Sequence, residues 1–195
     1  NKQIVDNDDN SELSEKINKM SDTSLDVGHN GHGEMGKPVV ITDPDEEIQA
    51  KITTGWKNYE FNSYASSLIS INRSLPDPRD DWCKSPDRND PNLPSTSVIV
   101  CFHNEAWSTL LRTVHSILNR SPDHLLKEII LVDDFSSLVH LKDDLDNYIA
   151  RLEKVKLLRA PERVGLSRAR LMGIAASSAS VLTFLDSHVE CNEGR

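Results

Sequence analysis

The sequence predicts an α/β fold with a mostly parallel sheet over residues 95–195, preceded by a disordered stem. Short apolar runs alternate there with stretches whose apolar residues recur every three or four positions. The length of 195 residues suits one domain with a tail. The acidity lies almost entirely in residues 1–50, where 12 Asp and Glu face 4 Lys and Arg, so this segment carries −8 of the formal net charge of −9. Such a charge argues against a nucleic-acid partner.

The first two segments of the chain lack the periodicity of a packed domain. Residues 1–50 contain no aromatic residue and few large apolar ones, so we expect a disordered acidic stem. The Gly- and His-containing stretch 28–34 is interpreted as linker rather than as a metal site. Residues 51–94 carry apolar anchors without sustained periodicity, followed by several prolines, which predicts an extended wrap and a Pro-rich approach to the core.

From residue 95 onward the elements follow in strict alternation. Strands are predicted at residues 97–102, 128–132, 155–158 and 181–185. Helices are predicted between them, at residues 108–119, 138–152 and 165–176. Strands joined by helices imply right-handed crossovers and parallel pairing.

Each predicted strand runs into polar or charged residues. These are His103-Asn104-Glu105, Asp133-Asp134, Glu162-Arg163 and Asp186-Ser187-His188. In open parallel sheets, ligands bind outside the carboxyl ends of the strands, so these residues predict a polar ligand site on one rim. Loops are polar in any protein, which explains each residue singly but less readily two acidic clusters and an arginine.

The residue types on this rim indicate a nucleotide and a cation. Asp186 and His188 flank one residue, and an oxygen with a nitrogen ligand suits Mn²⁺ or Zn²⁺, which would neutralise a diphosphate. Asp134 can accept hydrogen bonds from a base or sugar, and Arg163 can bind a phosphate. No G-x-G-x-x-G follows the first strand, which argues against a dinucleotide dehydrogenase.

The motifs together resemble the polypeptide N-acetylgalactosaminyltransferases. The resemblance begins near Trp56 and is dense from Leu75 to Glu190. It is carried by the segments 97–105, 107–114, 128–134, 163–166 and 182–188. It implies a Rossmann-like GT-A nucleotide-sugar-binding half-domain, and residues 1–50 resemble only the variable stem of that family.

The resemblance also implies an activity and its residues. The expected enzyme moves N-acetylgalactosamine (GalNAc) from UDP-GalNAc to Ser or Thr hydroxyls of proteins, with retention of configuration and with Mn²⁺ as cofactor. Asp186 and His188 match the metal ligands of the family's D-x-H motif. Donor binding is expected from Cys101, Asp134, Arg163 and Ser187, and no residue is assigned as catalytic. The expected location is the lumenal side of the Golgi membrane, with a type II anchor that this chain does not contain.

The family's catalytic domain continues past the D-x-H motif through a further metal histidine. We therefore expect this chain to hold half of a donor site and to be inactive alone. The alternative is a non-catalytic, truncated interaction or regulatory fragment of the same family. Cys83 is expected to pair with a cysteine downstream of Arg195, and Cys101 to be buried. His103 is expected to orient the loop after the first strand, and His115 and His140 to be surface or hydrogen-bonded positions.

Overall fold

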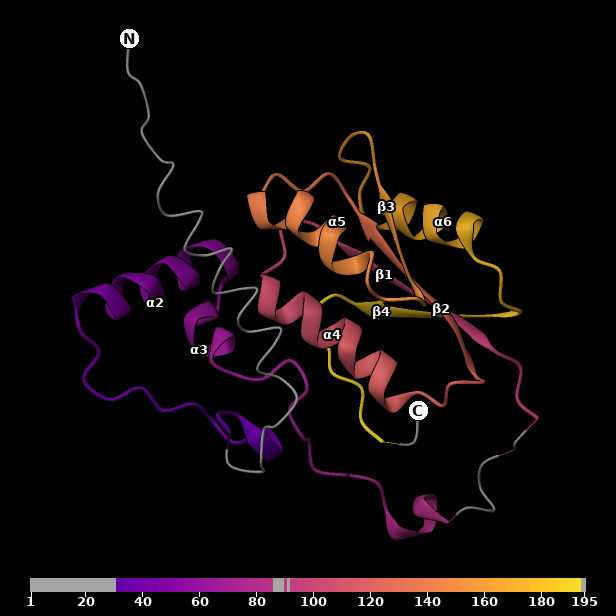
Figure 1. Ribbon diagram of the computed structural model, residues 1–195, viewed down its shortest axis with the longest axis horizontal. Helices are drawn as coiled ribbons and strands as arrows, with labels where there is room; N and C mark the ends of the chain where they lie inside the picture. Colours follow the sequence, from indigo (N-terminus) through magenta and orange to yellow (C-terminus); the bar gives the residue numbers. More distant parts are fainter. Residues whose placement is uncertain (1–30, 86–89, 91, 194–195) are drawn as a thin grey trace.

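A computed structural model describes residues 31–85, 90 and 92–193, and its centre is a parallel sheet (Figure 1). Within these residues the strands are β1 (Thr96–Phe102), β2 (Leu126–Asp133), β3 (Val155–Arg159) and β4 (Val181–Asp186). They form a four-stranded sheet in the order β3-β2-β1-β4, and every pairing is parallel. The predicted α/β class and the predicted strands are confirmed.

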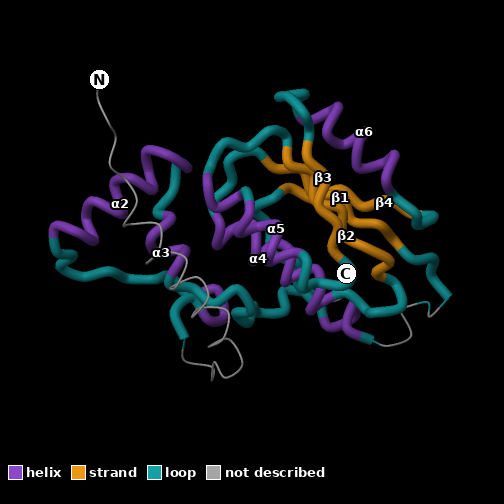
Figure 2. Tube along the Cα trace, turned by 45° about the horizontal axis from the view of Figure 1, so that its top comes forward, coloured by secondary structure: helices purple, strands orange, loops and turns teal. Residues whose placement is uncertain are grey.

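Helices cover both faces of the sheet (Figure 2). Alternate residues of β1 point to opposite faces, as in any strand. Val98, Val100 and Phe102 join the core formed with α4 (Trp107–Arg120) and α5 (Asp143–Ile149). Ile99 belongs to the other core, which contains Ala169 of α6 (Leu166–Ala176). β1 and β2 are therefore buried on both sides, which explains their nearly continuous apolar runs.

The route of the chain creates a topological switch point beside β1. The chain runs from β1 to β2 and β3 on one side, and then returns through α6 to β4 on the other side of β1. This reversal lies between β1 and β4, and ligands bind at such a point, outside the carboxyl ends of the strands. The motifs after β1 and β4 flank it.

Gly173 lets α6 approach the sheet closely. A Cβ atom at this position would lie 2.5 Å from Cγ2 of Ile99 in β1. We expect Gly173→Ala to lower the free energy of unfolding by about 1–3 kcal/mol, because overpacking outweighs the better helix propensity of alanine. Urea unfolding measures this, with the exposed Ser167→Ala in the same helix as the control. Equal stability of the two variants would contradict a tight contact.

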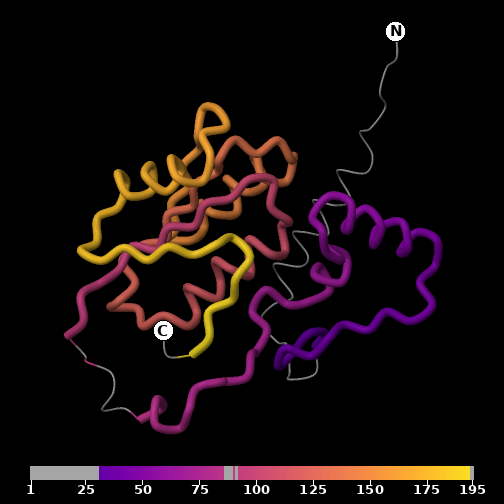
Figure 3. The backbone as a smooth tube through the Cα atoms, turned by 180° about the vertical axis from the view of Figure 1, so that it is seen from behind, coloured from indigo at the N-terminus to yellow at the C-terminus, as the bar shows by residue number. Residues whose placement is uncertain are grey.

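The segment before the sheet is helical where the sequence predicted an extended wrap. Figure 3 shows it from behind, standing to one side of the sheet. It contains α2 (Glu46–Tyr59) and α3 (Ser63–Ser67), after a short 3₁₀ turn, η1 (Glu34–Gly36). The prediction was wrong here because Gly55 is the one buried residue of α2, so no apolar stripe marks the helix. Local signals hold it instead: Asp45 caps its start by accepting from the Ile48 N–H at 2.8 Å.

The expected stem overlaps this ordered part of the chain. Residues 1–30, including the start of the 28–34 stretch, lie outside the described residues. Residues 31–50 contain η1 and the first turn of α2. Another 3₁₀ turn, η2 (Asp81–Lys84), lies in the Pro-rich approach. The division of the chain into residues 1–50, 51–94 and 95–195 remains a prediction.

The predicted helix 138–152 is shorter in the structure. It divides into a 3₁₀ turn, η4 (Val139–Leu141), and α5. Lys142 lies between them with a non-helical backbone, and its ammonium donates to the carbonyl of Ser136. The apolar spacing was nevertheless read correctly, because Leu141 and Leu145 are fully buried. No helix in the described ranges is long and apolar enough to cross a membrane.

A buried arginine fastens the α3 segment to α4. The side chain of Arg112 is 6% exposed, and its guanidinium donates to the carbonyls of Ser66 at 2.7 Å and Ile69 at 3.4 Å. It also lies 3.7 Å from a carboxylate oxygen of Glu190, in the segment after β4. Arg73 pairs with the same carboxylate at 2.6 Å. These charges join three segments that are distant in sequence.

Candidate functional site

The residues predicted to bind metal lie at the end of β4, beside the end of β1. Asp186 is the register partner of Cys101 in β1. The side chains of Asp186 and His188 are 58% and 61% exposed, so both are open to a ligand. The structure therefore brings the D-x-H motif to the switch point of the sheet.

Glu105, in the loop between β1 and α4, connects the D-x-H motif at the end of β4 to the end of β1. One of its carboxylate oxygens accepts from the hydroxyl of Ser187 at 2.8 Å and lies 3.2 Å from Nδ1 of His188. The other accepts from the backbone N–H of Ala106 at 2.9 Å. The Ser187 side chain thus faces Glu105, and its predicted role beside a donor stays a prediction.

Asp134 is more enclosed than a freely accessible nucleotide contact. It is 2% exposed, and its two oxygens accept from the backbone N–H groups of Val164 at 2.8 Å and Gly165 at 3.0 Å. Arg163, whose side chain is 52% exposed, forms an ion pair with the same carboxylate. The predicted pair thus meets in the structure, before the start of α6. A nucleotide that binds Asp134 would have to share it with Arg163.

His103 orients the rim, as expected. Its Nδ1 lies 2.8 Å from the backbone oxygen of Asp134, so Nδ1 carries the proton and donates. Burial lowers the pKa of His103, and the nearby Arg163 cation lowers it further. The ring is therefore neutral at neutral pH, and its Nε2 can accept from the side-chain amide of Asn104 at 3.3 Å.

His115 and His140 have hydrogen-bond partners, also as expected. Nε2 of His115 lies 2.8 Å from the hydroxyl of Tyr148, and burial lowers the pKa of His115. Nε2 of His140 lies 3.1 Å from the backbone oxygen of Glu105. Both side chains help to pack α4, η4 and the loop between β1 and α4.

Cys101 is half-buried beside the D-x-H motif, and not fully buried as the sequence predicted. Burial raises the pKa of its thiol, the nearby Arg170 cation opposes this rise, and Asp186 adds to it. The thiol is therefore protonated at neutral pH. Of the other two cysteines, Cys83 is exposed and Cys191 is buried, and all three are free thiols in the structure. The pairing of Cys83 with a downstream cysteine stays a prediction.

Sequence reasoning missed the contact that Glu105 makes, and it missed Arg170 and Phe135 altogether. Glu105 was noted for its charge, but a contact with a motif 83 residues away cannot be read from local pattern. Arg170 of α6 lies 3.7 Å from Asp186 and 5.9 Å from the centre of the Phe184 ring. Phe135, 53% exposed, has a left-handed backbone (φ 61°) directly after Asp134. A bulky residue in this conformation at a strand end is a signal of a constrained site.

The donor types fit a borderline divalent cation, although they are few. Among residues 31–85, 90 and 92–193, no group of three or more His, Cys, Asp or Glu side chains could hold a metal. Asp186 and His188 can supply one oxygen and one nitrogen, a pair that suits Mn²⁺. The remaining coordination positions would fall to groups outside this pair, such as diphosphate oxygens, water or a further histidine.

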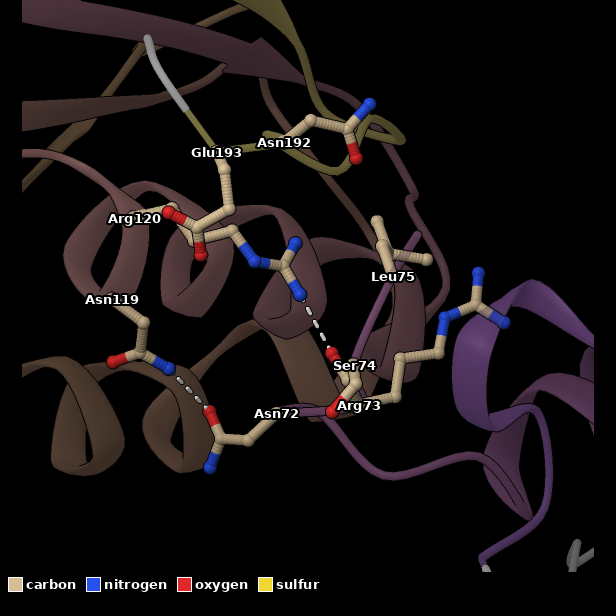
Figure 4. A pocket seen from close by; sticks show the side chains of 8 residues that line it. All are labelled: Asn72, Arg73, Ser74, Leu75, Asn119, Arg120, Asn192 and Glu193. Carbon is tan, nitrogen blue, oxygen red and sulfur yellow. Dashed lines mark hydrogen bonds between the residues drawn. The ribbon is translucent and has the colours of Figure 1, made fainter. Parts of the chain in front are cut away.

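A cavity of about 370 Å³ lies away from this rim, at the far end of α4 (Figure 4). Arg120 donates to the backbone oxygen of Arg73 at 2.6 Å, and Asn119 donates to the side-chain oxygen of Asn72 at 2.8 Å. The lining residues are Asn72, Arg73, Ser74, Leu75, Asn119, Arg120, Asn192 and Glu193. Because several of these groups already bond to one another, we do not place the functional site here.

The four-stranded parallel sheet with helices on both faces defines an α/β domain of the GT-A type. Residues 97–195 match the sequence profile of glycosyl transferase family 2. This match covers half of the chain, and the chain belongs to that family. The crystal structure of GalNAc-T7 with UDP, GalNAc and Mn²⁺ is similar, with a TM-score of 0.78 and 43% identity over 85% of this chain and 30% of that one.

Curated relatives confirm the resemblance seen in the motifs. Polypeptide N-acetylgalactosaminyltransferase 5 of Caenorhabditis elegans is 55% identical over 165 residues, which are 83% of this chain and 26% of that protein. Polypeptide N-acetylgalactosaminyltransferase 13 of Homo sapiens is also 55% identical over 165 residues, 84% of this chain and 29% of that protein. The chain thus spans between a quarter and a third of the length of these relatives.

Proposed function

We propose that this chain forms the nucleotide-sugar half of a polypeptide N-acetylgalactosaminyltransferase. The donor is UDP-GalNAc, the acceptors are Ser and Thr hydroxyls of proteins, and the cofactor is Mn²⁺. The observation that carries the proposal is the meeting of Asp186 and His188 with the end of β1 at the switch point of the sheet. A similar structure solved with UDP, GalNAc and Mn²⁺ supports the choice of donor and cation.

Different residues of the rim would bind different parts of the donor. Asp186 and His188 would hold the cation, which when bound offsets the negative charge that develops on a departing diphosphate. Arg163 is half-exposed beside Asp134 and can turn its planar fork toward a phosphate. Asp134 can accept from a base or ribose, and Cys101 reaches the donor through its backbone, since its thiol is half-buried.

Calorimetric titration of UDP, with and without Mn²⁺, tests this proposal. We expect binding that requires Mn²⁺, and we expect Asp186→Asn to weaken it at least 10-fold, because one of two protein ligands loses its charge. Asp123→Asn is the matched control, since Asp123 precedes β2 and so lies at the opposite end of the strands from the D-x-H motif. Absence of binding at millimolar UDP with Mn²⁺ would overturn the proposal.

The location is also part of the proposal. The family resemblance supports the lumenal side of the Golgi membrane, with a type II anchor outside the described residues. Imaging of the full-length protein against Golgi and endoplasmic-reticulum markers tests it. A uniform cytosolic signal would contradict it.

A further inference from the structure

The side chain of Glu105, which follows β1, contacts two consecutive residues of the D-x-H motif, which lies at the end of the neighbouring strand β4. The residue directly precedes the N-cap of α4, and its side chain is 14% exposed. Its contacts with Ser187 and His188 span 82 and 83 residues of sequence. The same carboxylate oxygen lies 2.8 Å from the hydroxyl of Ser187 and 3.2 Å from Nδ1 of His188.

Glu105 is itself held in place before any ligand arrives. Its second carboxylate oxygen accepts from the N–H of Ala106, and its backbone oxygen lies 3.1 Å from Nε2 of His140. The preceding Asn104 donates its backbone N–H to the hydroxyl of Ser136 at 2.9 Å. The carboxylate is therefore presented to His188 from a fixed loop.

The backbone of the D-x-H turn does not depend on Glu105. The hydroxyl of Thr113, on α4, accepts from the N–H of Val189 at 3.1 Å and lies 2.9 Å from the carbonyl oxygen of Ser187. The N–H of Cys191 donates to the hydroxyl of Ser116 at 2.9 Å. These bonds to α4 fix the turn, so Glu105 acts on the side chains of the motif and not on its path.

A carboxylate beside one nitrogen of an imidazole determines what the other nitrogen can do. A carboxylate accepts hydrogen bonds, so Nδ1 of His188 must carry the proton. Nε2 then keeps its lone pair, and the exposed ring presents it to solvent at the rim. Metal-binding histidines use this arrangement, in which an outer carboxylate fixes the tautomer and the ring orientation.

We propose that Glu105 is a positioning residue that fixes the tautomer and orientation of His188 so that Nε2 can bind the cation. This inference rests on the proposed function for the identity of the cation. The tautomer of His188 in the metal-free chain follows from Glu105 alone. The two claims can therefore fail separately.

Nitrogen-15 NMR of the His188 ring in the metal-free chain, at about pH 8 where a free imidazole is neutral, is the first test. We expect a protonated Nδ1 in the wild type and a shift toward a protonated Nε2 in Glu105→Met, whose side chain offers no oxygen to accept from Nδ1. If Glu105→Met fails to fold, Glu105→Asp replaces it, because its shorter side chain withdraws the carboxylate. An unchanged His188 tautomer in a folded variant would overturn the proposal.

The second test measures the affinity for UDP with Mn²⁺ by titration calorimetry. Glu105→Gln is expected to weaken it 10- to 100-fold, the usual cost of losing an outer partner of a metal ligand. Glu153→Gln makes the same charge change at an exposed position before β3, away from the rim, and is expected to change it less than about 2-fold. Equal affinities of the two variants would overturn the role of Glu105. Failure of the wild type to bind would instead overturn the proposed function, and the tautomer would still decide the role of Glu105.

Discussion

Replacement of Arg112 by methionine is expected to lower the free energy of unfolding by about 2–5 kcal/mol, because each buried carbonyl left without a donor costs about 1–3 kcal/mol. The guanidinium is almost fully buried and donates to the carbonyls of Ser66 and Ile69, beside Glu190. Methionine fills much of the space but leaves these carbonyls without a donor. Glu190, whose side chain is 16% exposed, would keep Arg73 as its partner. Urea unfolding followed by circular dichroism measures the loss.

An exposed ion pair provides the matched control for Arg112. Lys51 and Glu47 pair at 2.5 Å on the surface of α2, with side chains 48% and 77% exposed. Lys51→Met should cost no more than about 0.5 kcal/mol, because solvent screens an exposed pair. If Arg112→Met lowered the free energy of unfolding by as little, the buried arginine would not fasten the α3 segment to α4. A double variant with Glu190→Gln should be non-additive, since both residues belong to one network.

Acidification below about pH 4.5 is expected to remove a stabilising contribution from Glu128. Its side chain is 5% exposed, and burial opposes ionisation. The ammonium of Lys156 and the hydroxyls of Ser178 and Ser97 outweigh this effect and hold the pKa at about 2, below the ordinary 4.5. Because the pKa is lower in the folded state, the contribution is complete above pH 4.5 and is lost as the pH falls toward 2. This difference in pKa corresponds to about 3 kcal/mol.

Urea unfolding of the wild type and of Glu128→Gln, from about pH 7 down to about pH 3, measures this contribution. At neutral pH the variant should be the less stable protein, and the gap should narrow as the pH falls. Glu153→Gln, at an exposed position before β3, is the control. A gap that does not change with pH would show that the charge of Glu128 does not stabilise the fold.

The sequence predicted the sheet well because buried parallel strands leave a strong local signal. Each strand was placed within two residues of its bounds in the structure, since Val, Ile and Leu dominate where both faces are covered. α2 left no such signal, because its stability comes from caps and from exposed charges. A search for an apolar stripe therefore passes over it.

The candidate site was predicted in part, because some of its residues leave a local signal in the sequence and others do not. Asp186 and His188 stand out because they follow an apolar run, and the parallel topology places them at the carboxyl ends of the strands. The contact of Glu105 with Ser187 and His188 depends on the pairing of β4 with β1, which nothing in the neighbourhood of either strand specifies. Arg170 was overlooked because a charged residue in a helix ordinarily faces water, whereas the placement of α6 brings this one to Asp186.

The position of β4 has a consequence for the order in which the protein assembles. β1, α4 and β2 are contiguous and can fold locally, whereas contacts between β1 and β4 span 85 residues. Such distant pairings form late, because a long loop must close before they contribute. As the polypeptide leaves the ribosome, Glu105 is made long before His188 arrives. The end of the sheet that carries the D-x-H motif is therefore the last part to be completed, and a nascent chain that has stalled before β4 would hold a partial core without it.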